Sequence, residues 1–340
     1  MEKQEISKRM KKQGYRFVGN HSAVQICRWT KKSLRDEGVC YKEKFYGIKS
    51  HRCCQMTPWL ACQNRCIHCW RAVEFDFNKL ISHKKGMNSP SEIIDKSIQA
   101  QRKLLEGFKI LPETKEITVS KANMKKYNEA QEPTQFALSL LGEPTFYPLI
   151  GDLIQELRNR KKTSFLVTNG LFPKKLKELY EKEQLPTQLY VSVMAGNRKL
   201  FDKIVNSEDK KAWKKLNQTL ELMPSLGKNT RTVFRMNLIK EWNMEDKHIK
   251  EFSELIEKSQ PRIVEIKGFM SVGFARNRLG YEKMPRDKEM KEFVKKLEKE
   301  LKNSKNPETK KYKFLDEHEH SRAYVLAKRK SDLKIKKSEY

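Results

Sequence analysis

Residues 56–72 have the sequence MTPWLACQNRCIHCWRA, and the interpretation of the whole chain depends on this stretch. The apolar run at 56–61 has the length and composition of a buried β-strand. Three cysteines follow it, separated by three and then two residues: Cys62, Cys66 and Cys69. Because a loop this short can curl three thiolates toward one centre, the stretch predicts a strand that leads into a metal-binding loop.

Two kinds of metal site suit three such thiolates. A structural zinc ion takes four protein ligands, so His68 or Cys54 would have to be the fourth. An iron–sulfur cluster held by only three cysteines keeps one iron open for a substrate. Disulfides are not expected in a chain without a signal sequence, where an odd number of cysteines would also leave one thiol unpaired.

Outward from this loop, short β-branched runs alternate with longer stretches of helical periodicity. The predicted strands lie at 56–61, 116–120, 134–141, 164–168, 188–194, 231–238 and 263–269, with a late strand pair within 312–328. The predicted helices lie at 91–106, 147–160, 173–183, 211–223 and 246–258. Repeated strand–helix units with right-handed crossovers predict an α/β fold, a partial (β/α)6-type TIM barrel with ligands at the strand C-terminal ends.

The composition indicates a soluble globular protein with a strong positive charge. The 340 residues include 72 Lys and Arg against 43 Asp and Glu, a formal net charge of +29. A field of this sign attracts polyanions such as nucleic acids, although a salt-adapted or thermophilic surface is the alternative. We see no apolar stretch of membrane-spanning length and no secretory signal, so we expect a cytoplasmic protein without membrane contact. The first 20 and the last dozen residues are basic and are expected to be frayed.

The four remaining cysteines precede the loop: Cys27, Cys40, Cys53 and Cys54. The first three are spaced thirteen residues apart, which is too far for a local turn motif but suits a second three-thiolate cluster built from separate loops. Spacing favours Cys53 over Cys54, which is then a small bystander thiol.

The loop resembles the Cys-x-x-x-Cys-x-x-Cys signature of the radical SAM superfamily, whose open iron chelates S-adenosylmethionine. Gly142, Glu143 and Pro144 look like that superfamily's Gly-Gly-Glu element, with Leu141 in place of the first glycine. Asn169 and Ser192 stand at strand ends where the superfamily places polar contacts to the ligand. The resemblance implies that Gly142, Glu143, Asn169 and Ser192 bind S-adenosylmethionine, whereas the alternative for each is a turn residue capping a strand.

The sequence is similar to the tRNA 4-demethylwyosine synthases over nearly its whole length. The resemblance rests on the cysteine arrangement, on EPTQFALSLLGEPTFYP at 132–148 and on DEHEHSRAYVLAKR at 316–329. It implies a carbon–carbon lyase that builds the tricyclic base from N1-methylguanosine-37 of tRNA(Phe) and a two-carbon unit of pyruvate. It also implies two [4Fe–4S] clusters, one on Cys62, Cys66 and Cys69 and one on Cys27, Cys40 and Cys53.

Further expectations follow from this resemblance. Lys42 matches the position of a lysine that forms a Schiff base with pyruvate, which requires a neutral amine, and the alternative is a basic surface residue near tRNA. We expect a separate ferredoxin or flavodoxin as electron donor, and a monomer. The domains are expected as a basic extension with auxiliary-cluster cysteines at 1–44, a radical SAM core barrel at 45–290, and a helix/strand extension with a basic tail at 291–340.

Cations interleaved with aromatic residues predict the RNA contacts, because phosphates attract the charge and bases stack on rings. The candidates are Arg28, Trp29, Lys31, Lys32, Lys267, Arg276 and Arg278. Two other functions stay open on the sequence alone. One is a different radical SAM enzyme with an auxiliary cluster, and the other is a zinc-containing RNA-binding protein without enzymatic activity.

Overall fold

The computed structural model describes residues 3–81, 86–109 and 122–339. Its contacts divide the chain into two compact units. Unit one comprises Met1–Ala61, Asp76–Leu166 and Ile335–Tyr340, and unit two comprises Cys62–Phe75 and Val167–Lys334. The cysteine loop therefore groups with sequence more than ninety residues further along the chain rather than with its neighbours. The three-part division at residues 44 and 290 follows chain order and stays a prediction.

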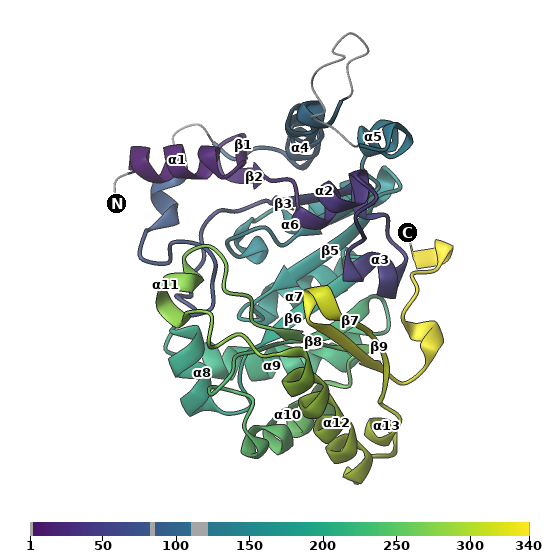
Figure 1. The fold of residues 1–340 in the computed structure, drawn as a ribbon. Helices are drawn as coiled ribbons and strands as arrows, with labels where there is room; N and C mark the ends of the chain where they lie inside the picture. The colour runs from purple at the N-terminus through teal and green to yellow at the C-terminus, as the bar shows by residue number, and fades with distance from the viewer. Residues whose placement is uncertain (1–2, 82–85, 110–121, 340) are drawn as a thin grey trace. The chain divides into compact units, whose positions relative to one another are not determined.

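Unit one contains an open sheet in the order β1-β2-β3-β4-β5 (Figure 1). The strands are β1 (Arg16–Val18), β2 (Ser22–Val24), β3 (Cys53–Thr57), β4 (Gln135–Leu138) and β5 (Thr163–Thr168). β1, β2 and β3 pair antiparallel in turn, and β3, β4 and β5 are parallel. β3 begins three residues before the predicted strand and ends at Thr57, because Pro58 has no amide hydrogen to continue the ladder.

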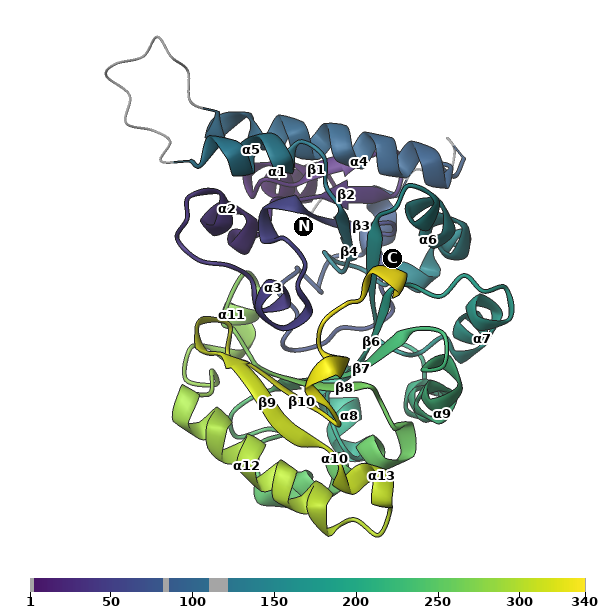
Figure 2. The ribbon, with the colours of Figure 1, turned by 90° about the vertical axis from the view of Figure 1, so that its right-hand side faces the viewer.

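Helices cover the sheet of unit one. They are α1 (Lys3–Lys12), α2 (Arg28–Leu34), α3 (Tyr41–Tyr46), α4 (Pro90–Leu105), α5 (Met124–Ala130) and α6 (Ile150–Asn159). α4 packs on β1, β2, β3 and α6, and Figure 2 shows it beside β1 and β2. The first turn of α4 is capped, because the Ser89 hydroxyl accepts a hydrogen bond of 3.3 Å from the amide of Glu92.

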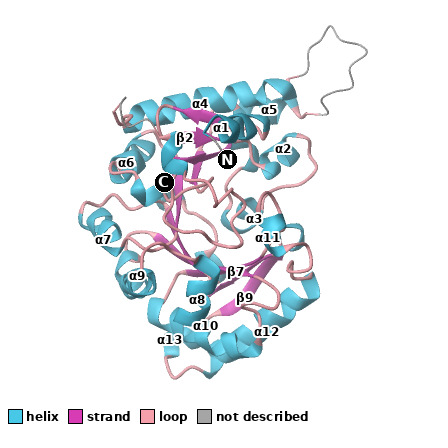
Figure 3. Cartoon of the chain, turned by 90° about the vertical axis from the view of Figure 1, so that its left-hand side faces the viewer, coloured by secondary structure: helices cyan, strands magenta, loops and turns pink. Residues whose placement is uncertain are grey.

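Unit two contains an open sheet in the order β6-β7-β8-β10-β9. Its strands are β6 (Gln188–Val193), β7 (Arg231–Leu238), β8 (Ile263–Gly268), β9 (Lys313–His318) and β10 (Ala323–Ala327). Its helices are α7 (Pro173–Glu181), α8 (Arg198–Val205), α9 (Ala212–Leu226), α10 (Asp246–Ser259), α11 (Ala275–Leu279), α12 (Asp287–Asn303) and α13 (Pro307–Lys310). β6, β7 and β8 are parallel, whereas β10 and β9 add an antiparallel hairpin. α12 packs against α10 and along β9, as Figures 2 and 3 show.

The predicted fold class is confirmed. In the described part of the chain, β3, β4 and β5 are parallel in unit one, and β6, β7 and β8 are parallel in unit two. Helices lie between these strands along the chain, and neither unit's sheet closes on itself. The predicted strand pair within 312–328 is the β9–β10 hairpin. The predicted strand at 116–120 lies outside the described residues. No helix among the described residues is long and apolar enough to cross a bilayer.

The expectation of frayed ends is wrong. α1 and β1 lie within residues 3–20, and Ile6 and Met10 are buried on one face of α1. Their spacing of four residues gives the basic segment a narrow apolar stripe. Near the other end, short 3-10 turns follow residue 329, and the amide of Ile335 donates to the carbonyl of Tyr46 at 3.1 Å.

Candidate active site

The cysteine loop of unit two is fixed to the end of α8. The amide of Arg65 donates to the carbonyl of Asn206, and the amide of Ile67 donates to that of Ile204, both at 3.0 Å. Within the loop, the amide of Cys69 donates to the carbonyl of Cys66 at 3.0 Å and closes a turn. These bonds hold the backbone between the thiols in a defined curve.

The three thiols of this loop lie within electrostatic range of one another. Burial raises the pKa of Cys66, and the neighbouring Cys69 and Cys62 raise it further, while Arg71 opposes them. Such a thiol stays protonated unless a cation compensates the charge of its thiolate, and iron supplies that compensation. The burial and mutual proximity therefore suit a shared metal cluster.

Two arginines hold the loop from within unit two. The Arg71 guanidinium donates to the Cys69 sulfur at 3.3 Å and to the carbonyl of Asn64 at 2.6 Å. Arg278, from α11, donates to the carbonyls of Ile67, Cys69 and Arg71, at 3.0 Å for the first and 3.2 Å for the last. It also pairs with Glu74 at 2.7 Å. The spacing of the cysteines did not predict that either arginine would hold the loop.

The loop also contains buried polar atoms without a partner among the described residues, namely Gln63 Oε1, Asn64 Oδ1 and His68 Nδ1. Buried polar atoms in folded proteins usually have hydrogen-bond partners, because leaving them unpaired costs free energy. A polar ligand bound at the loop would supply such partners. Burial, reinforced by Arg278, lowers the pKa of His68 to about 4 and keeps its ring neutral at physiological pH. Within the described ranges, no three Cys, His, Asp or Glu side chains gather around a point suited to one metal ion. A four-iron cluster engages each thiolate at a separate corner, so the residues present fit it.

Polar side chains at strand ends accompany the loop in unit two. Asn169 follows β5, and its amide nitrogen lies 3.8 Å from the Cys62 sulfur. Ser192, on β6, is in register with Arg235 on β7, which is in register with Glu265 on β8. Arg235 Nε lies 3.5 Å from a carboxylate oxygen of Glu265, whose exposure is 0%. Sequence reasoning missed this buried ion pair, although two charges within otherwise apolar strands were its signal.

Unit one contributes the Gly142 and Glu143 element. The Glu143 amide donates to the carbonyl of Ala61 at 2.8 Å, and its carboxylate accepts from both the amide and the hydroxyl of Thr145 at 3.1 and 2.7 Å. Gly142 has φ +73, and a Cβ there would lie 2.1 Å from the carbonyl oxygen of Trp59. The glycine therefore permits both a left-handed backbone and a close approach of two chain segments.

Gly142→Ala is expected to lower the free energy of unfolding by more than about 2 kcal/mol, because the left-handed backbone alone costs about 1–2 kcal/mol and the Trp59 carbonyl must also move. Gly14→Ala is the matched control, since Gly14 has φ +85 but nothing within 4 Å of its Cβ position. Urea titrations of both variants measure the difference. Equal losses would show that the close approach adds nothing.

The second set of cysteines assembles within unit one. Cys27 and Cys40 stand at the N-caps of α2 and α3, and Cys53 begins β3. Burial raises the pKa of Cys53 to about 12, with Lys42 acting in the opposite direction and Cys27 and Cys40 adding to the rise. Cys54 is the next residue on the strand and therefore points to the opposite face. Burial raises the pKa of its thiol, Cys53 raises it further, and Lys162 acts in the opposite direction. The contacts thus group Cys53, rather than Cys54, with the other two.

Lys42 is a buried residue, with 8% of its surface exposed. It lies in the first turn of α3, where its amide donates to the Cys40 sulfur at 3.5 Å. Its Nζ lies 5.2 Å from the centre of the Phe165 ring. A lysine on the outer surface would contact water instead, so this placement favours a specific role beside the cysteines.

The candidate RNA contacts lie on separate elements. In unit one, Trp29 has Arg28 at 6.0 Å and Lys32 at 5.6 Å from its ring, while Lys31 is exposed on the same helix. In unit two, Arg276 lies 5.0 Å from the ring of Tyr281, which is 60% exposed. Lys267 donates to the carbonyl of Ser321 at 3.0 Å, and Arg278 holds the cysteine loop. RNA binding by these residues stays a prediction.

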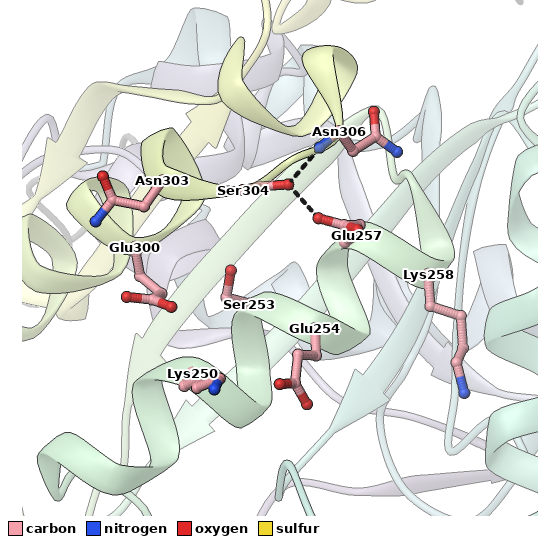
Figure 4. Close-up of a pocket in the computed structure, with 9 residues that line it drawn as sticks. All are labelled: Lys250, Ser253, Glu254, Glu257, Lys258, Glu300, Asn303, Ser304 and Asn306. Carbon is pink, nitrogen blue, oxygen red and sulfur yellow. Dashed lines mark hydrogen bonds between the residues drawn. The ribbon is translucent and has the colours of Figure 1, made fainter.

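A separate pocket of about 430 Å³ lies between α10 and α12 (Figure 4). The Ser304 hydroxyl donates to Glu257 and accepts from the amide of Asn306, so these groups connect the end of α12 to the following turn. None of the predicted site residues is among the described residues that line it. The pocket belongs to a helix junction rather than to the candidate active site.

Comparison with known proteins identifies the family. Residues 56–253 match the radical SAM superfamily, and residues 258–328 match a family described as wyosine base formation. The chain is 41% identical to the S-adenosyl-L-methionine-dependent tRNA 4-demethylwyosine synthase of Pyrococcus horikoshii, over 95% of this chain and 88% of that protein.

Two solved structures are also similar. TYW1 with a lysine-pyruvate adduct bound superposes with a TM-score of 0.79 at 31% identity, covering 99% of each chain. Archaeal TYW1 superposes with a TM-score of 0.72 at 29% identity, over 98% of this chain and all of that one. With two cysteine triads, a Gly-Glu element and these matches, the chain belongs to the tRNA 4-demethylwyosine synthases of the radical SAM superfamily.

Proposed function

We propose that this chain forms 4-demethylwyosine at position 37 of tRNA(Phe), from N1-methylguanosine and a two-carbon unit of pyruvate, as a carbon–carbon lyase. The observation that carries the proposal is the pair of cysteine triads, one in each unit, with a buried lysine beside the triad of unit one. Family membership supports the tRNA substrate.

Cys62, Cys66 and Cys69 would hold the cluster that binds S-adenosylmethionine. When bound, this group supplies an open iron and one electron for cleavage of the sulfonium. We assign the ligand's polar contacts to Gly142, Glu143, Asn169 and Ser192.

Cys27, Cys40 and Cys53 would hold a second [4Fe–4S] cluster, and Lys42 would hold pyruvate beside it. In this proposal the Lys42 amine attacks the keto carbon, and one water leaves as the C=N bond forms. Support comes from the burial of Lys42 next to the triad and from the lysine-pyruvate adduct in the TYW1 structure. The cysteines would therefore serve two tasks, radical generation and chelation of the α-keto acid.

The cationic face of α2 is expected to contact tRNA phosphates. Arg28→Gln should weaken tRNA binding at every salt concentration and reduce the slope of log affinity against log salt by about 1, because one phosphate contact is lost. Arg198→Gln is the control, since Arg198 on α8 is also exposed but has Asp202 at 3.5 Å. Binding isotherms at several salt concentrations measure both slopes. An unchanged slope for Arg28→Gln would remove this residue from the interface.

The function is tested by anaerobic reconstitution followed by iron and sulfide analysis. The protein is then incubated with N1-methylguanosine-37 tRNA, S-adenosylmethionine, pyruvate and dithionite, which replaces the separate ferredoxin or flavodoxin that we propose as donor. About eight irons per chain and a new tricyclic base are expected, with the protein eluting as a monomer. Four irons with deoxyadenosine but no base change would indicate a different radical SAM enzyme, and zinc without iron would indicate an RNA-binding protein.

A further inference from the structure

The charged side chain of Arg71 directly contacts a sulfur of the cysteine loop. Its Nε donates to the Cys69 sulfur at 3.3 Å, while another nitrogen of the same guanidinium donates to the Asn64 carbonyl at 2.6 Å. One side chain thus bridges the residues just after the first cysteine and the sulfur of the last. An arginine guanidinium keeps its charge in proteins, so this contact places a permanent cation beside the Cys69 sulfur.

Arg278 fixes this geometry from outside the loop. It donates to the carbonyl of Arg71 at 3.2 Å and to that of Ile67 at 3.0 Å, and it pairs with Glu74. The backbone that carries Arg71 is therefore held independently of the guanidinium's own contacts. This arrangement pre-orients the cation toward Cys69 before any cluster is present.

We propose that Arg71 is a positioning residue that sets the reduction potential of the cluster on Cys62, Cys66 and Cys69 through the sulfur of Cys69. The inference rests on the proposed function, which places a cluster on these cysteines. Taking up one electron adds negative charge to the cluster and its thiolates. A fixed cation and a charge-assisted hydrogen bond to a ligand sulfur stabilise that more negative state and raise the potential.

Arg65 provides a matched control within the same loop. It lies between Cys62 and Cys66, but its guanidinium pairs with Glu208 at 2.7 Å and donates to the carbonyl of Val73. Its charge is therefore compensated by a carboxylate, and it donates to a carbonyl rather than to a cysteine sulfur. Replacing either arginine removes one positive charge. Arg71→Gln also removes the hydrogen bonds to the Cys69 sulfur and the Asn64 carbonyl, whereas Arg65→Gln removes those to Glu208 and the Val73 carbonyl.

The test is a potentiometric titration of the reconstituted full-length protein with dithionite, followed by electron paramagnetic resonance of the reduced cluster. The auxiliary triad is replaced by alanine in every sample, so that one cluster contributes the signal. Arg71→Gln is expected to lower the ratio of reduced to oxidised cluster about tenfold at a fixed potential, which is about 59 mV for a one-electron couple. Arg71→Lys should lie between Arg71→Gln and the parent, and Arg65→Gln should match the parent.

An Arg71→Gln protein with full iron and an unchanged potential would overturn the proposal, as would an equal shift in Arg65→Gln. If Arg71→Gln does not retain iron, Arg71→Lys decides, and an unchanged potential there rejects the proposal. The wyosine assignment is judged separately by base formation in the intact protein. An Arg71 shift without the tricyclic product would remove that assignment and leave the role of Arg71 in place.

Discussion

Replacing Cys27, Cys40 and Cys53 together with alanine is expected to halve the iron content of the reconstituted protein and to abolish the tricyclic base, while S-adenosylmethionine is still cleaved. The reason is that these thiols assemble within unit one, whereas the thiols that serve cleavage lie in unit two. Iron analysis, deoxyadenosine yield and nucleoside analysis of the tRNA measure the three quantities. Base formation should fall below detection, a loss of about 10³-fold or more, because the α-keto acid loses its chelator.

The reciprocal triple variant of Cys62, Cys66 and Cys69 should also lose half of the iron, but it should produce neither deoxyadenosine nor base. Cys54→Ala is the control for removal of a buried thiol from β3, since Cys54 faces away from the triad. It should retain about eight irons. If Cys54→Ala lost the auxiliary iron and Cys53→Ala kept it, our choice between the two adjacent thiols would be wrong.

Lys42→Ala is expected to reduce formation of the base by at least about 10²-fold while both clusters and deoxyadenosine formation persist. Without the amine, pyruvate loses the covalent bond that fixes its carbonyl carbon, and misplacement by about 1 Å is enough for a loss of this size. The measurement is single-turnover product yield together with borohydride reduction, which traps an imine as a stable adduct visible by mass spectrometry.

Lys44→Ala is the matched control, because Lys44 lies on the same helix and is exposed. It should give the parent yield and the parent adduct. An adduct that survives in Lys42→Ala would move the Schiff base to another lysine. Full turnover in Lys42→Ala with intact clusters would eliminate the imine from the reaction.

Local patterns in the sequence were sufficient for most of the fold. The boundaries of β7 were predicted to the residue, because Arg231–Leu238 is a long β-branched and apolar run between polar segments. The helix predicted at 91–106 is α4, which begins one residue earlier at Pro90, directly after the capping Ser89. The early end of β3 was missed because the apolar residues continue beyond Pro58, and hydrophobicity outweighed the missing amide hydrogen.

In the candidate site, too, residues with a local sequence signal could be predicted, and residues that depend on long-range contacts could not. Cys62, Cys66 and Cys69 could be recognised because their spacing is local. The spacing of Cys27, Cys40 and Cys53 suggested a second triad, and the resemblance to a family supplied Lys42. The contacts of Arg71 and Arg278 with the loop could not be found in this way. Arg278 is separated from Cys69 by 209 positions, and in the sequence it is one arginine among 72 basic residues. The Arg235–Glu265 pair likewise depends on the register of two strands that are joined through α10.

The dependence of the cysteine loop on Arg278 has a consequence for how the protein is made in the cell. A ribosome synthesises the three cysteines first, and the carbonyls of Ile67, Cys69 and Arg71 receive their arginine only after about 200 further residues have been translated, since Arg278 lies 209 positions after Cys69. Nascent chains shorter than this carry exposed thiols in an unsupported loop. We therefore expect iron–sulfur loading to follow the synthesis of α11, and chains truncated before α11 should accumulate without the first cluster.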